Sequence, residues 1–104
     1  MIVEERTYQI AAGKLPDYLA RYEELGLELQ KRILGNLIGY FTTEIGPLSR
    51  LVHLWGYESL TDRERRRAEL AGLAAWQEYL RVCTPMIVGM ENRILVPTAF
   101  SPLR

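Results

Sequence analysis

The 104-residue chain lacks several features that would point directly to a function. Its thirteen basic and thirteen acidic residues cancel, so no overall field attracts nucleic acid or an anionic membrane surface, and we expect no nucleic-acid partner. No apolar run approaches the roughly 20 residues that cross a bilayer. The start of the chain also lacks the basic and apolar segments of a secretory signal peptide. The sequence therefore predicts a cytoplasmic protein without a membrane span.

Cysteine and histidine each occur once, as Cys83 and His53. A single cysteine forms no internal disulfide, and one residue of each type is too few for a clustered metal site. The glycines match neither a phosphate-binding loop nor a dinucleotide fingerprint. Cys83 has no evident base near it in the sequence and is interpreted as a small buried side chain, not a nucleophile. The sequence thus predicts no metal and no cofactor.

Strand and helix patterns alternate along the chain. Strands are predicted over residues 2–10, 37–45, 50–58 and 90–96. One helix with an apolar stripe is predicted from near Pro16 to a stop at Gly35. A second helix, capped by Ser59, is predicted to bend at Gly72 and to end at Cys83. The order βαββαβ with right-handed crossovers predicts an α+β, ferredoxin-like domain over residues 1–104, a four-stranded antiparallel sheet with helices on one face.

The strand over residues 50–58 has two unlike faces, because alternate side chains of a strand point to the same side. One face carries Leu51, His53, Trp55 and Tyr57, and the other carries Val52, Leu54 and Gly56. Helices cover only one side of such a sheet. We interpret the second set as the covered one and expect the aromatic set on the open side. An aromatic face left in water is rare in a monomer, so this assignment predicts a homodimer or a higher oligomer.

Four segments in a fixed order resemble those of a known family. They read Glu5-Arg-Thr-Tyr-Gln-Ile-Ala-Ala-Gly-Lys-Leu15, Gly39-Tyr-Phe-Thr-Thr-Glu-Ile-Gly-Pro47, His53-Leu-Trp-Gly-Tyr57 and Glu91-Asn-Arg-Ile-Leu-Val-Pro97. Together they resemble the NIPSNAP family of the dimeric α/β-barrel superfamily, although the Asp-Pro often found before Trp76 is absent. The resemblance implies ferredoxin-like protomers whose sheets meet face to face. It implies no single chemistry, because the superfamily spans cofactor-free oxygenases, haem enzymes, isomerases and proteins without known chemistry.

Candidate site residues lie on or near the aromatic face. His53 has an ordinary pKa near neutrality and is a candidate general base or haem ligand; the alternative, which we favour, is a hydrogen-bonded interface histidine. Candidates to line a pocket for a flat apolar ligand, or to form an ordinary interface, are Trp55, Tyr57, Tyr8 and Tyr40.

Charged residues give weaker signals. Arg6 with Glu44 or Glu91 is a candidate to orient an anionic substrate, but such charges on one sheet are more often cross-strand pairs. A basic run comprises Arg63, Arg65, Arg66 and Arg67. Because Asp62 and Arg66 are four residues apart, as are Arg65 and Glu69, we interpret this run as a solvated helix face.

Three functions remain open, and the sequence does not decide whether the protein is an enzyme. The leading hypothesis is a homo-oligomeric small-molecule-binding or scaffold protein, because no acid–base pair is evident. The alternative is a cofactor-free monooxygenase or isomerase acting on a hydrophobic carbonyl or aromatic substrate. There His53 would take a proton, Arg6 or Tyr8 would stabilise an oxyanion, and Trp55 and Tyr57 would stack on the substrate. Haem binding through His53 is the least favoured.

Overall fold

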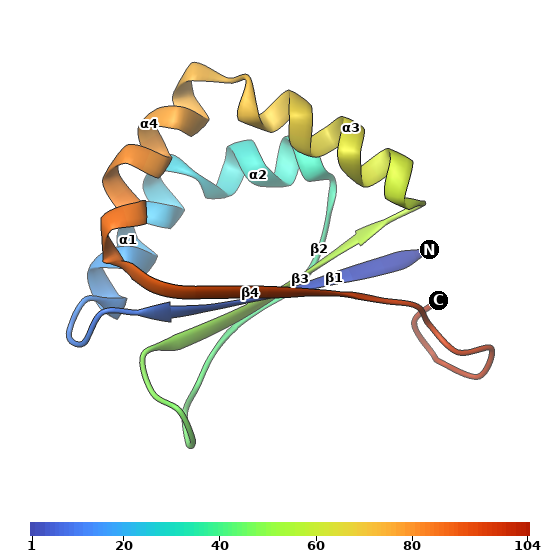
Figure 1. The fold of residues 1–104 in the computed structure, drawn as a ribbon, viewed down its shortest axis with the longest axis horizontal. Coiled ribbons are helices and arrows are strands. Elements are labelled where there is room, and N and C mark those ends of the chain that lie inside the picture. Colours follow the sequence, from blue (N-terminus) through green and yellow to red (C-terminus); the bar gives the residue numbers. More distant parts are fainter.

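The computed structural model, which describes residues 1–104, has two layers: a four-stranded sheet and four helices that all lie on one of its faces (Figure 1). The elements are β1 Ile2–Ile10, α1 Leu15–Leu25, α2 Leu27–Leu34, β2 Asn36–Thr42, β3 Arg50–Tyr57, α3 Leu60–Ala71, α4 Ala74–Cys83, a 3-10 turn Thr84–Met86 and β4 Ile87–Leu95. The strand order is β2-β3-β1-β4, with antiparallel neighbours throughout. This confirms the predicted ferredoxin-like α+β fold. None of the helices has the length and apolar character needed to cross a bilayer.

The helices differ from prediction at one point. The first predicted helix is two helices, α1 and α2, which meet at Gly26. A Cβ atom at Gly26 would lie 3.0 Å from ring carbons of Tyr79 and 3.1 Å from Tyr22, so glycine allows α4 to approach this junction. The predicted break at Gly72 between α3 and α4 is confirmed, as is the cap: the Ser59 hydroxyl accepts a hydrogen bond from the Asp62 amide at 3.1 Å.

Two strand boundaries also moved. Strand β2 ends at Thr42 instead of residue 45, because the chain then enters a loop with positive φ angles at Gly46 and Ser49. Strand β4 begins at Ile87 instead of residue 90, because Ile87 still pairs with the end of β1 across a register shift.

The predicted assignment of the two faces of β3 was wrong. The aromatic set, Leu51, His53, Trp55 and Tyr57, is at most 3% exposed and belongs to the core under the helices. Val52 and Leu54 are only half-buried, on the side without helices. A Cβ atom at Gly56 would meet the side chains of Asn36 and Met1, not a helix. Alternation groups side chains by face but does not say which face is covered, and the bulkier set fills the space beneath the helices.

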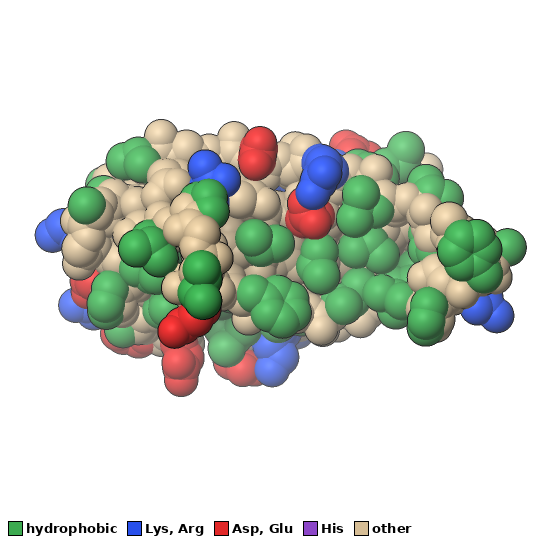
Figure 2. All heavy atoms as spheres, turned by 90° about the horizontal axis from the view of Figure 1, so that it is seen from below, with side chains coloured by type: hydrophobic (Ala, Val, Ile, Leu, Met, Phe, Trp, Pro, Cys, Tyr) green, Lys and Arg blue, Asp and Glu red, His purple; other side chains and the backbone are tan.

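The uncovered face of the sheet is nevertheless partly apolar. Figure 2 views the molecule from the sheet side and shows hydrophobic side chains spread over this face, with fewer charged ones between them. From the strand register, its apolar members include Phe41, Val52, Leu54 and Leu95. Glu5 and Arg93 form an ion pair on the same face. An open apolar sheet face therefore exists, but it is made of other residues than predicted.

Candidate functional site

A cavity of about 220 Å³ lies between the sheet and the helices, where β1 and β4 face α3 and α4. Its inner wall is made mainly of buried rings, those of Tyr8, Tyr22, His53, Trp76 and Tyr79. Its exposed lining residues, which form the entrance, are Ala71, Leu80, Thr84 and Met90. The cavity is thus a hollow in the hydrophobic core that reaches the surface.

Four of the predicted site residues line this cavity: Arg6, Tyr8, Tyr40 and His53. The other four do not. Trp55 is fully buried behind His53, and Tyr57 lies in the core outside the cavity. Glu44 is exposed in the loop after β2, and Glu91 is on the open face of the sheet, so neither reaches Arg6. The predicted pairing of Arg6 with Glu44 or Glu91 was therefore wrong.

The hydrogen bond from Trp55 defines the protonation of His53. The indole Nε1–H donates to His53 Nδ1 at 2.7 Å, so Nδ1 carries a lone pair and the neutral ring has its proton on Nε2. Burial, together with the charge of Arg6, lowers the pKa of His53 to about 3. His53 therefore presents a neutral N–H donor. With its lone pair occupied, it fits neither the role of general base nor that of haem ligand.

Three buried atoms on the cavity lining have no hydrogen-bond partner: His53 Nε2, the Tyr40 hydroxyl and Arg67 Nη1. The Tyr40 ring stacks between His53, at a centroid distance of 4.6 Å, and Tyr22, at 4.9 Å. Burial raises the pKa of Tyr40, so its hydroxyl keeps its proton. Buried polar atoms are seldom left unpaired, so these three need an explanation.

Arg67 corrects the interpretation of the basic run as a solvated face. Arg65 is exposed and Arg66 pairs with Asp62 as predicted, but Arg67 lines the cavity from α3. Arg63 also points inward, to the carboxylate of Glu4. The signal was present in the sequence, because Arg63, Arg67 and the buried Leu70 are spaced four and three residues apart and so share one helix stripe.

Glu4, which the sequence analysis did not single out, holds Arg6 in place. One oxygen of its fully buried carboxylate accepts hydrogen bonds from Arg6 at 3.0 Å, Arg63 at 2.8 Å and Asn92 at 2.8 Å. Burial raises the pKa of Glu4, but the bonds from Arg63 and Asn92 and the charge of Arg6 outweigh burial and lower it to about 2. Arg6 also donates to the Tyr8 hydroxyl at 2.9 Å. Its charge is therefore neutralised within the protein.

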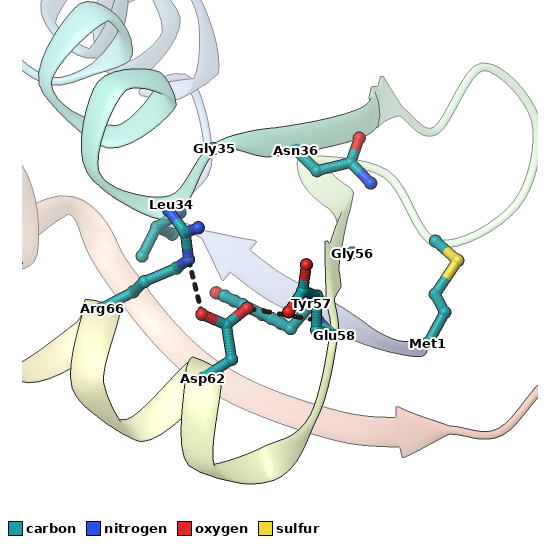
Figure 3. Close-up of a pocket in the computed structure, with 9 residues that line it drawn as sticks. All are labelled: Met1, Leu34, Gly35, Asn36, Gly56, Tyr57, Glu58, Asp62 and Arg66. Carbon is teal, nitrogen blue, oxygen red and sulfur yellow. Dashed lines mark hydrogen bonds and ion pairs between the residues drawn. The ribbon is translucent and has the colours of Figure 1, made fainter.

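A larger and more open pocket, of about 440 Å³, lies at the start of α3 (Figure 3). There the Asp62 carboxylate accepts hydrogen bonds from Arg65 at 2.7 Å, Arg66 at 2.9 Å and the Glu58 amide at 3.1 Å. The bonds from Arg65 and the Glu58 amide lower the pKa of Asp62 to about 2. Arg66 also donates to the carbonyl of Ile33 at 3.0 Å, which joins the end of α2 to α3. Asp62 and Arg66 are therefore paired in this pocket, whereas the buried hydroxyl of Tyr57, which also lines it, has no hydrogen-bond partner.

Fold and site together define an α+β ferredoxin-like protein with a cavity between its two layers. The sequence model of the NIPSNAP family matches residues 3–102, and the chain belongs to this family. The protein NipSnap homolog 2 of Danio rerio is 34% identical, over 99% of this chain and 35% of its own length. The chain thus spans about a third of the length of that curated relative.

Solved structures of the family have the same fold. A NIPSNAP family protein from Agrobacterium tumefaciens is 54% identical with a TM-score of 0.97, covering 99% of this chain and 98% of its own. An uncharacterized NIPSNAP-like domain protein from Burkholderia xenovorans is 50% identical with a TM-score of 0.93, covering 97% and 88%.

A more distant neighbour is a putative antibiotic biosynthesis monooxygenase from Nitrosomonas europaea, 10% identical with a TM-score of 0.68, covering 93% of this chain and 98% of its own. At that identity the likeness shows the fold alone. Another Agrobacterium tumefaciens relative is described as a NIPSNAP family protein with unknown function. Membership in the family therefore leaves the molecular function undetermined.

Proposed function

We propose that this protein is a homo-oligomer that binds a small molecule in the cavity between its sheet and its helices. The observation that carries the proposal is the set of unpartnered polar atoms on the cavity lining, His53 Nε2, the Tyr40 hydroxyl and Arg67 Nη1. An unpaired buried polar group costs about 1–3 kcal/mol. Three such groups around one hollow are consistent with a ligand that completes their hydrogen bonds.

Closing the entrance tests this proposal. Ala71 lies at the entrance, whereas Ala68 is exposed on the same helix and does not line the cavity. Binding of toluene and of single-ring polar compounds is measured by calorimetry for the protein and for Ala71→Trp and Ala68→Trp. We expect binding that Ala71→Trp abolishes and Ala68→Trp retains. If no compound binds, the ligand-binding proposal is wrong and a purely structural scaffold takes its place.

The open sheet face supports the oligomeric part of the proposal. Phe41 is 56% exposed there and lies beside Val52, with Leu54 and Leu95 on the same face. A contiguous apolar patch of this kind usually marks an association site. Two chains joined through these faces would cover both patches and give the dimeric α/β barrel that the sequence resemblance implies.

Sedimentation measures the oligomeric state directly. We expect a dimeric mass for the protein and a monomeric mass for Leu54→Arg, with the helical circular-dichroism signal unchanged. A mass that Leu54→Arg leaves unaltered contradicts the face-to-face dimer. Trp55→Arg is unsuitable for this test because Trp55 is in the core, where an arginine would unfold the chain.

The alternative function is a cofactor-free monooxygenase or isomerase acting on a hydrophobic carbonyl or aromatic substrate. It is supported by the N–H and O–H donors on the cavity lining, which suit a developing oxyanion, and by the fold of the putative antibiotic biosynthesis monooxygenase. It lacks a base: no carboxylate lines the cavity, and the lone pair of His53 is bonded to Trp55. Oxygen uptake with an aromatic substrate, lost in Tyr40→Phe, would favour this alternative over simple binding.

A further inference from the structure

We propose that the cavity binds a small cyclic carboxylate of the size of benzoate, whose carboxylate oxygens accept hydrogen bonds from His53, Tyr40 and Arg67. This inference rests on the proposed ligand-binding function of the same cavity and adds the chemical class of the ligand.

The charge of the cavity lining favours an anion. Two arginines, Arg6 and Arg67, line it, and no aspartate or glutamate does. Arg6 is neutralised by Glu4, but Arg67 makes no ion pair, and its Nη1 is buried without a partner. Both guanidinium groups are close enough to His53 for their charges to lower its pKa. Arg67 is half-buried, and a partly buried cation without a counter-ion is costly, so an anion held here would stabilise the protein.

The hydrogen-bonding capacity of the lining specifies acceptors on the ligand. His53 Nε2 and Arg67 Nη1 can only donate, and the Tyr40 hydroxyl, which keeps its proton, can donate as well. The ligand must therefore supply several lone pairs in a small volume. An ionised carboxylate has two oxygens with about four acceptor sites and no donor, which matches this lining. A primary amide of the same shape would bring N–H groups to donors and lose part of the binding.

The walls and the volume set the size of the rest of the ligand. The rings of Tyr22, Trp76 and Tyr79 give an aromatic wall on which a flat ring can stack. An apolar cavity of about 150 Å³ holds benzene. The volume here, about 220 Å³, therefore has room for one ring and a carboxylate.

Calorimetry with benzoate, benzamide and toluene at pH 7.5 tests the ligand class. We expect benzoate to bind at least roughly tenfold more tightly than its neutral isostere benzamide, since hydrogen bonds to charged groups are the stronger ones. Equal affinity for benzoate and benzamide, or binding of toluene without benzoate, would overturn the carboxylate class and leave the ligand-binding proposal intact. If none of the three binds, both proposals fail.

Arg67→Met and Arg65→Met form a matched pair on one helix, because Arg65 is exposed and bonded to Asp62 while Arg67 lines the cavity. We expect Arg67→Met to weaken benzoate binding roughly 10- to 100-fold, the loss of one hydrogen bond to a charged group, and to change benzamide binding little. Arg65→Met should leave both affinities unchanged. Equal benzoate affinity in Arg67→Met and the parent protein would contradict the role of Arg67.

A second pair uses an isosteric change that the fold tolerates. Tyr40→Phe removes a hydroxyl without a partner, and we expect benzoate binding to weaken roughly tenfold. Tyr18→Phe removes a hydroxyl that is bonded to Tyr79 but does not itself line the cavity, and it should weaken benzoate binding less than Tyr40→Phe does. If both variants bind benzoate like the parent protein, Tyr40 does not hold the carboxylate and the proposed site is wrong.

Discussion

Two pockets of this protein contain similar polar residues but differ in how far those residues pair with one another. In the pocket of Figure 3, Asp62 accepts three hydrogen bonds and Arg66 donates both to it and to the end of α2. In the cavity beside His53, which has about half the volume, Arg67 Nη1 and the Tyr40 hydroxyl lack a hydrogen-bond partner. The larger pocket is therefore a structural junction, and the smaller cavity is the candidate site. The larger pocket has one unpaired buried hydroxyl, that of Tyr57, whereas the smaller cavity has three unpaired buried polar atoms.

Replacing Glu4 should lower the free energy of unfolding most, because Glu4 holds Arg6, which lines the cavity. Glu4→Gln takes the buried carboxylate away from Arg6 and Arg63, and breaking a buried ion pair in this way costs about 3–5 kcal/mol of unfolding free energy. Glu64→Gln is the control, since Glu64 also bonds Arg63 but is exposed, and it should cost less than about 1 kcal/mol. Urea unfolding measures both. Equal losses in the two variants would mean that Glu4 is no more important than a surface charge.

Acidification should lower the free energy of unfolding first through His53, which lines the cavity, and only at lower pH through Asp62, in the pocket of Figure 3. The pKa of His53 is about 3 in the folded protein against 6.5 when exposed, so below pH 6.5 the unfolded chain binds a proton that the folded chain does not. The unfolding free energy then falls by about 1.4 kcal/mol for each pH unit, or about 2 kcal/mol between pH 6.5 and 5. Asp62, whose pKa falls from 3.8 to about 2 on folding, loses its contribution only below about pH 4.

Urea unfolding at pH 7.5, 6 and 5 checks this order. In His53→Gln the loss of stability between pH 7.5 and 5 should largely disappear, because no other group with a lowered pKa titrates in that range. An equally steep loss in His53→Gln would show that the acid sensitivity arises elsewhere.

Removing the helix cap at the pocket of Figure 3 should cost less stability. Ser59→Ala removes the hydroxyl that accepts from the Asp62 amide and should cost about 1 kcal/mol. Thr61→Ala, an exposed position in the same turn, serves as the control and should change stability by less than half as much. Thermal unfolding measures the difference. A cost in Ser59→Ala no greater than in Thr61→Ala would mean that the pocket does not depend on its cap.

The smallest change in stability is expected at a side chain that already lacks a hydrogen-bond partner. Tyr40→Phe should leave the stability of the ligand-free protein unchanged or slightly higher, because it removes an unpaired buried hydroxyl. Tyr18→Phe should cost about 1 kcal/mol, because Tyr18 and Tyr79 share a hydrogen bond of 2.8 Å. Equal costs in the two variants would show that the Tyr40 hydroxyl is paired after all and would remove one of the three unpartnered groups.

The candidate site could be predicted from the sequence only on its sheet side. Arg6, Tyr8, Tyr40 and His53 come from three neighbouring strands, and all four line the cavity; their roles stay predictions. The helix side was missed, above all Arg67, since nothing local shows that one turn of a charged helix faces a hollow in the core. Glu44 was included because the second strand was predicted to run to residue 45, but the chain leaves the sheet at Thr42 before reaching it.

The sequence by itself determined the order of the strands and helices, the breaks at Gly35 and Gly72 and the cap at Ser59, because turn residues, caps and hydrophobic periods act over a few neighbouring residues. Only the tertiary structure decided which face of β3 the helices cover. Alternation is symmetric between the two faces, and the choice depends on how the side chains of both layers fill a shared volume. The same packing left His53, Tyr40 and Arg67 beside one cavity without partners, a property of three distant segments that no single stretch of sequence encodes.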